Sequence, residues 1–202
     1  MVCTKCRLSQ GRTNVVWADG NLDADLLFIG EGPGFHEDRQ GLPFVGAAGK
    51  LLDSLLAEIG LDRGKAAIVN VVKCRPPGNR DPLPDEIESC RPWLEAQLRH
   101  MQPRVIVTLG NFATRFMLEQ PIGITRARGH RYRRRGATVV PTFHPAAALR
   151  GGRFGGMNPI DAIREDLALV KTVLDETSAP RPAEVRAPVA QAADDSRQLG
   201  LF

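Results

Sequence analysis

The stretch that most constrains the fold is residues 25–34, where a buried strand is predicted to end in a glycine-rich turn. Residues 25–29 form a largely apolar run of strand length. The Gly30-Glu31-Gly32-Pro33-Gly34 segment then disfavours both strand and helix, and it sets a carboxylate where the strand ends. Open α/β sheets carry their functional side chains at such strand ends. The segment therefore predicts a site as well as a strand.

The remaining apolar runs alternate with helical periodicity. Strands are predicted over residues 66–72, 104–109 and 137–142, the last preceded by a hairpin, and helices over residues 47–60, 85–100, 111–118 and 159–174. Asp85 is the expected cap of its helix. This alternation predicts an α/β fold, a three-layer αβα sandwich around a mostly parallel four-stranded sheet, within one domain of residues 1–174.

Composition separates this domain from a tail. With 43% hydrophobic and 25% charged residues, the chain has an ordinary globular composition. It contains no run of membrane-spanning length and no signal sequence, so we expect a cytoplasmic protein. Residues 175–202 are dominated by Ala, Pro, Asp and Arg, which predicts a disordered tail. The tail ends in an apolar sequence, Gln198 to Phe202, that is typical of a docking peptide.

Positive charge is concentrated late in the chain. The formal net charge is only +4, but residues 121–155 hold eight arginines and no acidic residue. This asymmetry predicts a polyanionic partner, although a solvated basic surface is the alternative.

The four cysteines are the candidate metal ligands. They are Cys3, Cys6, Cys74 and Cys90. A reducing compartment favours metal binding over disulfides. The C-x2-C and C-x15-C spacings place the last two cysteines on separate turns of a long loop, and they leave an iron-sulfur cluster, a zinc ion and unligated buried thiols as alternatives.

Polar side chains follow several of the predicted strands. Glu31, Asn70, Asn111 and His144 fall at or just beyond strand ends, so the topology can bring them to one cleft. A dinucleotide site is disfavoured because Phe35 replaces the third glycine, Pro33 interrupts the turn, and no helix is expected for about ten residues. A Walker A loop and a nucleophile elbow are both absent from the sequence.

The remaining groups suit a base flipped out of nucleic acid. Phe44 could stack on the base, Asn70 could hydrogen-bond its Watson-Crick edge, and the arginine-rich segment could hold phosphates. His144 and Glu31 would then flank the glycosidic bond. The residues thus predict chemistry on a nucleotide rather than acyl transfer.

Four ordered motifs closely resemble those of the family 4 uracil-DNA glycosylases. They cover residues 30–34, 41–46, 70–80 and 144–146, within a similarity that spans roughly residues 3–172. The resemblance implies a [4Fe-4S] cluster on the four cysteines and hydrolysis of uracil from DNA to an abasic site, which starts base excision repair. It implies a uracil pocket of Glu31, Gly32, Pro33, Glu37, Phe44, Asn70 and His144.

The resemblance also implies individual roles. His144 would donate to uracil O2, Glu31 would orient water or stabilise the sugar cation, and Glu37 would fill the space of a thymine methyl group. The expected DNA contacts are Pro145, Ala146, Ala147, Leu149 and Arg150, which would fill the vacated stack, with Arg126 and Arg128 on phosphates.

The last residues are similar to a bacterial sliding-clamp peptide. The matching positions are Gln198, Leu199, Leu201 and Phe202. They imply that the tail docks on the clamp. We also expect a monomeric, nucleoid-associated enzyme. The alternative is a non-catalytic or covalent uracil-DNA binding protein that recruits repair partners. A related covalent group has a histidine in a basic loop where this chain has Pro76-Pro77-Gly78, which favours turnover.

Overall fold

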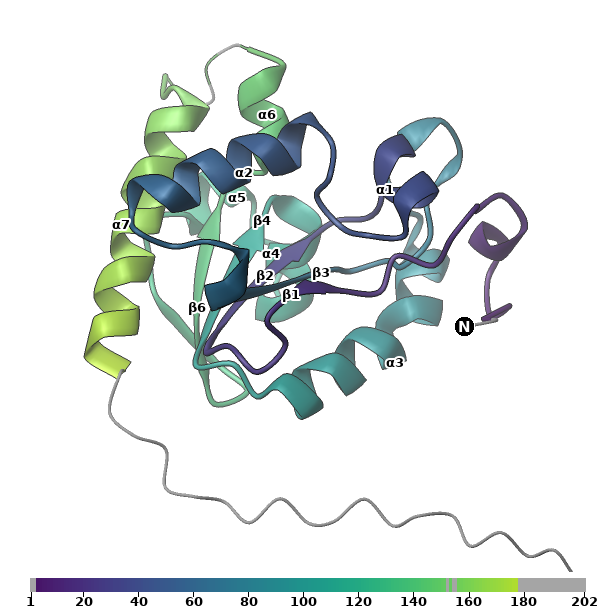
Figure 1. The fold of residues 1–202 in the computed structure, drawn as a ribbon, viewed down its shortest axis with the longest axis horizontal. Coiled ribbons are helices and arrows are strands. Elements are labelled where there is room, and N and C mark those ends of the chain that lie inside the picture. The colour runs from purple at the N-terminus through teal and green to yellow at the C-terminus, as the bar shows by residue number, and fades with distance from the viewer. Residues whose placement is uncertain (1–2, 152, 154–155, 178–202) are drawn as a thin grey trace, which may run out of the picture.

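The computed structural model describes residues 3–151, 153 and 156–177, which form three layers around one sheet (Figure 1). The strands are β1 (Asp19–Gly20), β2 (Leu26–Gly30), β3 (Ala66–Asn70), β4 (Val105–Leu109), β5 (Tyr132–Arg134) and β6 (Ala137–Thr142), in the order β1-β3-β2-β4-β6-β5. The four central strands are parallel, as predicted, and the two short edge strands are antiparallel to their neighbours. The sheet therefore has six strands rather than four.

Helices cover both faces of the sheet. They are α1 (Phe35–Gln40), α2 (Ala47–Glu58), α3 (Pro84–Met101), α4 (Asn111–Leu118), α5 (Ile124–Ala127), α6 (Pro145–Leu149) and α7 (Pro159–Thr177), with 3-10 turns η1 (Arg7–Gln10), η2 (Arg63–Lys65) and η3 (Pro77–Asn79). No described helix is long and apolar enough to cross a membrane.

Side-chain alternation along the strands creates two hydrophobic cores. Leu27 and Ile29 of β2 belong to the core beneath α3 and α4. Leu26 and Phe28 belong to the core beneath α2 and α7, on the opposite face (Figure 1). All five residues of β2 are buried, which is the pattern of a central parallel strand.

Several local predictions were wrong. A helix, α1, begins at Phe35, where no helix was expected. Leu83 rather than Asp85 stands at the start of α3, where its N–H donates to the Glu86 carboxylate. Cys90 lies within α3 and not on a loop. At the other end of the domain, α7 continues to Thr177, past the predicted start of the tail.

Candidate active site

The carboxyl ends of neighbouring strands bring the predicted pocket residues together. Gly30 of β2 is in register with Asn70 of β3. A Cβ atom at Gly30 would lie 2.4 Å from Asn70 Oδ1 and 2.6 Å from the Phe44 ring. Only a residue without a side chain lets these two groups approach one another here. His144, after β6, stacks on the same aromatic ring with centroids 5.5 Å apart.

Phe44 is held in an unfavourable backbone conformation. Its φ of 55° lies in the left-handed region, which costs a non-glycine residue on the order of 1 kcal/mol or more. The Arg63 guanidinium donates to the carbonyl oxygens of Pro43 and Phe44, and it also pairs with Asp19 and Asp53. The surrounding structure therefore fixes the turn that presents the ring. Sequence reasoning missed Arg63, because a single arginine in a short 3-10 turn carries no motif.

The Asn70 side chain is an amide without a partner. It is 2% exposed, and neither Oδ1 nor Nδ2 has a hydrogen-bond partner among the described residues. Buried amides are normally satisfied, so an unsatisfied pair of donor and acceptor atoms indicates a place for a polar ligand. Lys73 Nζ donates to the Asn70 backbone oxygen over 2.6 Å and also to Gln97 Oε1, which fixes the backbone of this residue.

His144 is oriented by the backbone that follows it. The Ala146 N–H donates to His144 Nδ1 over 3.1 Å. In the neutral ring, Nε2 must then carry the proton. Burial, assisted by the charge of Arg150, lowers the pKa of His144 to about 4. The side chain is thus a neutral donor at neutral pH.

Glu31 is a carboxyl group with a raised pKa. Burial is the main cause and the negative charge of Asp81 adds to it, so the pKa rises to about 7 despite the opposing charge of Arg150. Glu31 follows β2, Asp81 lies in the loop before α3, and Arg150 follows α6. Their mutual influence places these three segments near one another. A partly buried carboxyl group whose pKa is raised toward neutrality is a candidate for acid-base or electrostatic catalysis.

Glu37 connects two loops of the pocket. Its carboxylate accepts hydrogen bonds from the N–H groups of Gly34, Val45 and Gly46, over 3.1, 3.0 and 2.8 Å. The glycine-rich turn after β2 and the turn that carries Phe44 are therefore fastened together. Gly32 and Pro33 lie in the first of these loops, and Pro33 is buried.

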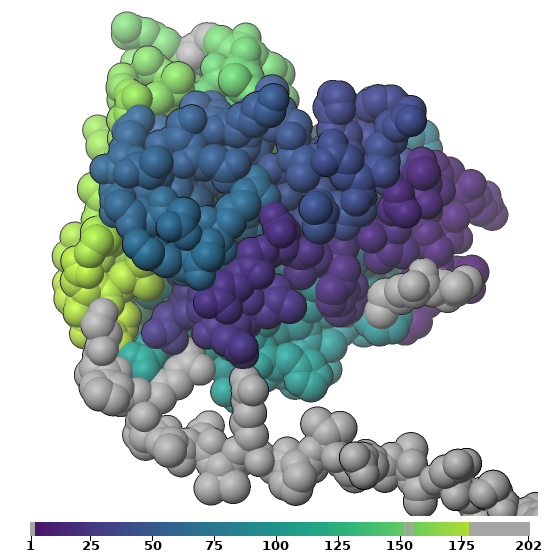
Figure 2. Space-filling model, in the orientation of Figure 1, coloured from purple at the N-terminus to yellow at the C-terminus, as the bar shows by residue number. Residues whose placement is uncertain are grey.

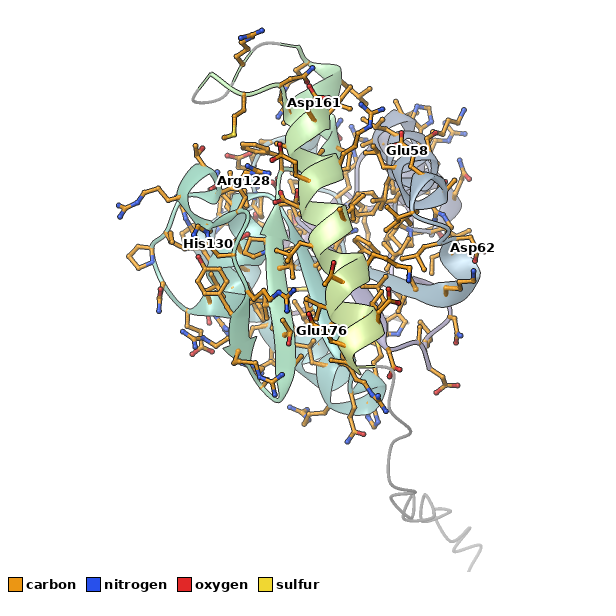
Figure 3. The ribbon with its side chains drawn as sticks, turned by 90° about the vertical axis from the view of Figure 1, so that its left-hand side faces the viewer. Glu58, Asp62, Arg128, His130, Asp161 and Glu176 are labelled. Carbon is orange, nitrogen blue, oxygen red and sulfur yellow. The ribbon has the colours of Figure 1, made fainter. Side chains whose placement is uncertain are left out.

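Two predicted functional residues are used elsewhere. The Arg128 side chain is 9% exposed and pairs with Asp166 and Glu165 of α7 at 3.0 and 2.9 Å. Figure 3 shows Arg128 beside the upper part of this helix. Asn111 Oδ1 accepts the Ile124 N–H. Both side chains have structural roles.

Two more arginines of the arginine-rich segment form ion pairs. Arg131 pairs with Glu176, and Arg135 pairs with Glu95 and Glu119. Glu95 and Glu176 come from α3 and α7, and Glu119 directly follows α4, so a charge count within residues 121–155 could not reveal these pairs.

The predicted DNA-contact segment after His144 forms α6. Pro145 and Ala147 are buried, Ala146 is half-buried, and Leu149 and Arg150 are exposed at its end. Leu149 is 52% exposed, although it is a large apolar side chain. Arg126 is also exposed.

The four cysteines line a single cavity. Cys3 and Cys6 meet Cys74 and Cys90 there, beside Trp17 and Trp93. Within residues 3–151, 153 and 156–177, no three His, Cys, Asp or Glu side chains are close enough together to hold one metal ion.

Donors surround these sulfur atoms. Arg12 Nη1 donates to Cys74 Sγ, and the Lys73 N–H donates to Cys90 Sγ, both over 3.3 Å. Burial raises the pKa of Cys90 to about 11. Trp93 Nε1 is buried without a hydrogen-bond partner in the described structure.

Comparisons with known proteins agree with this geometry. Residues 17–168 match the family model of the uracil DNA glycosylase superfamily. The chain is 49% identical over 156 residues to a type-4 uracil-DNA glycosylase of Sulfurisphaera tokodaii. The aligned region covers 73% of this chain and 71% of the relative. It is also 49% identical over 150 residues to a type-4 uracil-DNA glycosylase of Thermotoga maritima. This aligned region covers 73% of this chain and 78% of the relative.

A second type of glycosylase is more distant. A type-5 uracil-DNA glycosylase of Pyrobaculum aerophilum is 32% identical over 154 residues, which cover 67% of this chain and 66% of the relative. The higher identity to the type-4 enzymes agrees with the motifs at the ends of β2, β3 and β6. The chain belongs to the uracil-DNA glycosylase superfamily, among its type-4 members.

Proposed function

We propose that this protein removes uracil from DNA by hydrolysing the N-glycosidic bond of a flipped deoxyuridine, leaving an abasic site for base excision repair. The observation that carries this proposal is the buried, unpartnered amide of Asn70 beside Phe44 and His144. An aromatic face and a free amide form the recognition set that a planar base requires.

Cleavage of the bond leaves negative charge on uracil and positive charge on the sugar. His144 Nε2–H would donate to uracil O2, where the negative charge develops. A neutral donor needs no proton from solvent before each turnover. Glu31, in its ionised form, would either orient the attacking water or stabilise the sugar cation.

Base selection would come from Asn70 and from the two loops that Glu37 joins, which are the glycine-rich turn after β2 and the turn that carries Phe44. Uracil and cytosine reverse donor and acceptor at N3 and at position 4, so a fixed amide distinguishes them. Glu37, Gly32 and Pro33 would shape the wall next to C5 of the base, where a thymine methyl group would need space. The three backbone hydrogen bonds of Glu37 support a rigid wall.

The DNA would be held by α6 and by exposed arginines. Leu149 and Arg150 would enter the gap left by the uracil, supported by Pro145, Ala146 and Ala147, and Arg126 would contact a phosphate. Arg128 would not contact the DNA, because its guanidinium is already paired with Asp166.

The cysteine cavity fits an iron-sulfur cluster. The four thiols would ligate it, and Arg12, the Lys73 N–H and the unpartnered Trp93 Nε1 are donors for its sulfur atoms. When bound, the cluster would supply covalent cross-linking of the N-terminal segment to the residues after β3 and to α3.

Further partners are proposed from the sequence alone. The clamp peptide, Gln198 to Phe202, lies outside the described residues. We propose that it docks on a sliding clamp while the monomeric enzyme works at the cytoplasmic nucleoid. Deleting residues 198–202 should abolish clamp binding and leave excision from short oligonucleotides intact.

Uracil excision is tested on oligonucleotides with and without one uracil. Fresh brown protein should produce an alkali-sensitive site only at the uracil. A covalent or non-catalytic binder would instead shift the oligonucleotide in a gel without releasing uracil, and this result would overturn the proposal.

A further inference from the structure

An exposed aromatic side chain with two arginines lies immediately after the catalytic loop. Phe35, the first residue of α1, is 45% exposed. The guanidinium carbon of Arg75 lies 5.1 Å from the centre of its ring, and that of Arg39 lies 5.6 Å away. The His36 ring stands edge-on to Phe35 with centroids 5.5 Å apart.

The two arginines lack an ion-pair partner among the described residues. Arg131 and Arg135, on either side of β5, are both paired. The neighbouring acids are engaged by backbone groups, since Glu37 accepts from Gly34, Val45 and Gly46 and Asp38 accepts from Thr13. The carboxylates of Glu37 and Asp38 therefore do not occupy the guanidinium N–H groups of Arg39 and Arg75.

The Phe35 ring positions the two arginines and leaves their guanidinium N–H groups available as hydrogen-bond donors. A cation-π contact uses the flat face of a guanidinium, whereas its N–H groups point outward in the plane. Arg75 uses Nε for Asn79 Oδ1 at 2.6 Å. Its terminal nitrogens make no hydrogen bond with another described residue. Two such groups on one ring can present several donors to the oxygens of a phosphate.

The surface is rigidly connected to the pocket. Asp38 of α1 accepts the Thr13 N–H over 2.8 Å, and Figure 2 shows α1 in dark blue beside the purple N-terminal segment. Arg75 directly follows the cluster ligand Cys74, and Glu37 fastens α1 to the Phe44 turn. A phosphate bound here would have a fixed position relative to the uracil.

We propose that Phe35, Arg39 and Arg75 form a phosphate-binding site for the DNA strand that carries the uracil, close to the flipped nucleotide and separate from α6. This inference rests on the proposed glycosylase activity. The bound group is a backbone phosphodiester, which both single-stranded and duplex DNA supply.

The test compares kcat and KM for a uracil oligonucleotide at increasing KCl. Arg39→Gln and Arg75→Gln should each raise KM about 3–10-fold without changing kcat. Each should also reduce the slope of log kcat/KM against log salt by about 0.7 on single strands or about 0.9 on duplex. Phe35→Ala should raise KM although it removes no charge. Arg99→Gln, an exposed arginine at the end of α3, is the matched control and should change nothing.

A second measurement locates the phosphate. Replacing one phosphate at a time by an uncharged methylphosphonate should weaken binding by the native protein at one position near the uracil. Arg39→Gln and Arg75→Gln should be insensitive to that same replacement. Fluorescence anisotropy reports this binding even if no uracil is released, so the outcome is separable from that of the glycosylase proposal.

Other outcomes would overturn the inference. If native protein excises uracil while the Arg39 and Arg75 variants keep the KM and salt slope of Arg99→Gln, no phosphate is bound here. A fall in kcat at constant KM would instead assign these residues to the pocket structure. Melting temperatures identify any variant that is unfolded, and Phe35→Leu then replaces Phe35→Ala with the same expected rise in KM.

Discussion

The imidazole of His144 lies 5.5 Å from the phenyl ring of Phe44, centroid to centroid, with 27° between the two planes. The two rings come from the loop after β6 and the turn before α2, which are about one hundred residues apart in the sequence. The Asn70 side chain and the Phe44 ring both lie against Gly30, which has no side chain to separate them. One aromatic face, one amide and one imidazole donor thus border the same small region.

The raised pKa of Glu31 predicts a pH-dependent rate. If the carboxylate is the active form, kcat/KM should rise with pH through about 7, the pKa set by burial and Asp81. Glu31→Gln should lower the rate by about 10²–10⁴-fold and remove this dependence. A flat profile in the native enzyme between pH 5 and 8 would refute an ionised Glu31.

Glu31 should also destabilise the folded state at high pH. Its folded pKa of about 7 lies above the ordinary value of 4.5, so the folded protein binds this proton more tightly than the unfolded chain does. Its stabilising contribution is complete below pH 4.5 and is lost as the pH rises through 7. Denaturation at pH 8 should show Glu31→Gln to be more stable than the native protein, and equal stability would argue against the shift.

His144 should act as a neutral group throughout this range. Its pKa of about 4 adds no further limb to the rate profile above pH 5. His144→Ala should reduce kcat by about 10²–10³-fold, the usual loss for one donor to a developing anion. Nitrogen NMR should show the proton on Nε2, and a protonated or Nδ1–H ring would contradict the assigned hydrogen bond.

Asn70 should trade stability for recognition. Its unsatisfied amide costs about 1–3 kcal/mol, which Asn70→Leu, of similar shape, would recover. We expect this variant to melt at a higher temperature and to lose uracil excision. Lower stability together with lost excision would mean that Asn70 supports the fold rather than the base.

Arg63 should control the pocket from outside it. Arg63→Lys keeps the charge but cannot hold Pro43, Phe44, Asp19 and Asp53 at once. Release of the strained turn should raise KM and lower kcat together, with a lower melting temperature. Arg164→Lys, which alters an exposed pair with Glu58, is the control and should retain native kinetics.

Lys73 should connect the cysteine cavity to the pocket. Lys73→Met removes the bonds to the Asn70 carbonyl and to Gln97, and it leaves an unbranched apolar side chain that is one atom shorter. We expect weaker discrimination between uracil and cytosine, together with a loss of bound iron during gel filtration. Retention of both properties would show that the buried amino group is dispensable.

The sequence predicted the fold where local signals are strong. Buried runs such as residues 26–30 and 66–70 identify central parallel strands, because both faces must be apolar. The antiparallel pair of β5 and β6 confirms the hairpin predicted before residues 137–142. The edge strand β1 has two residues, too few for periodicity to register. Helix α1 was missed because Gly34 and Pro33 suggested a continuing loop, whereas Glu37 caps the helix from within.

The site could be predicted only as a set of residue types at strand ends. Glu31, Asn70 and His144 follow from topology, and Phe44 from the motif it belongs to. Arg128 was misjudged because its partners, Glu165 and Asp166, lie on α7 far along the chain. The clamping role of Arg63 likewise depends on three separate segments, which no local pattern links.

The most direct measurement is a crystal structure of the iron-loaded protein with an oligonucleotide that carries 2′-fluoro-deoxyuridine, whose glycosidic bond resists cleavage. The uracil should lie extruded against Phe44, with its N3 and O4 edge on the Asn70 amide and O2 within hydrogen-bond distance of His144 Nε2. A uracil that remains stacked in the DNA, or that binds away from these three side chains, would contradict the account.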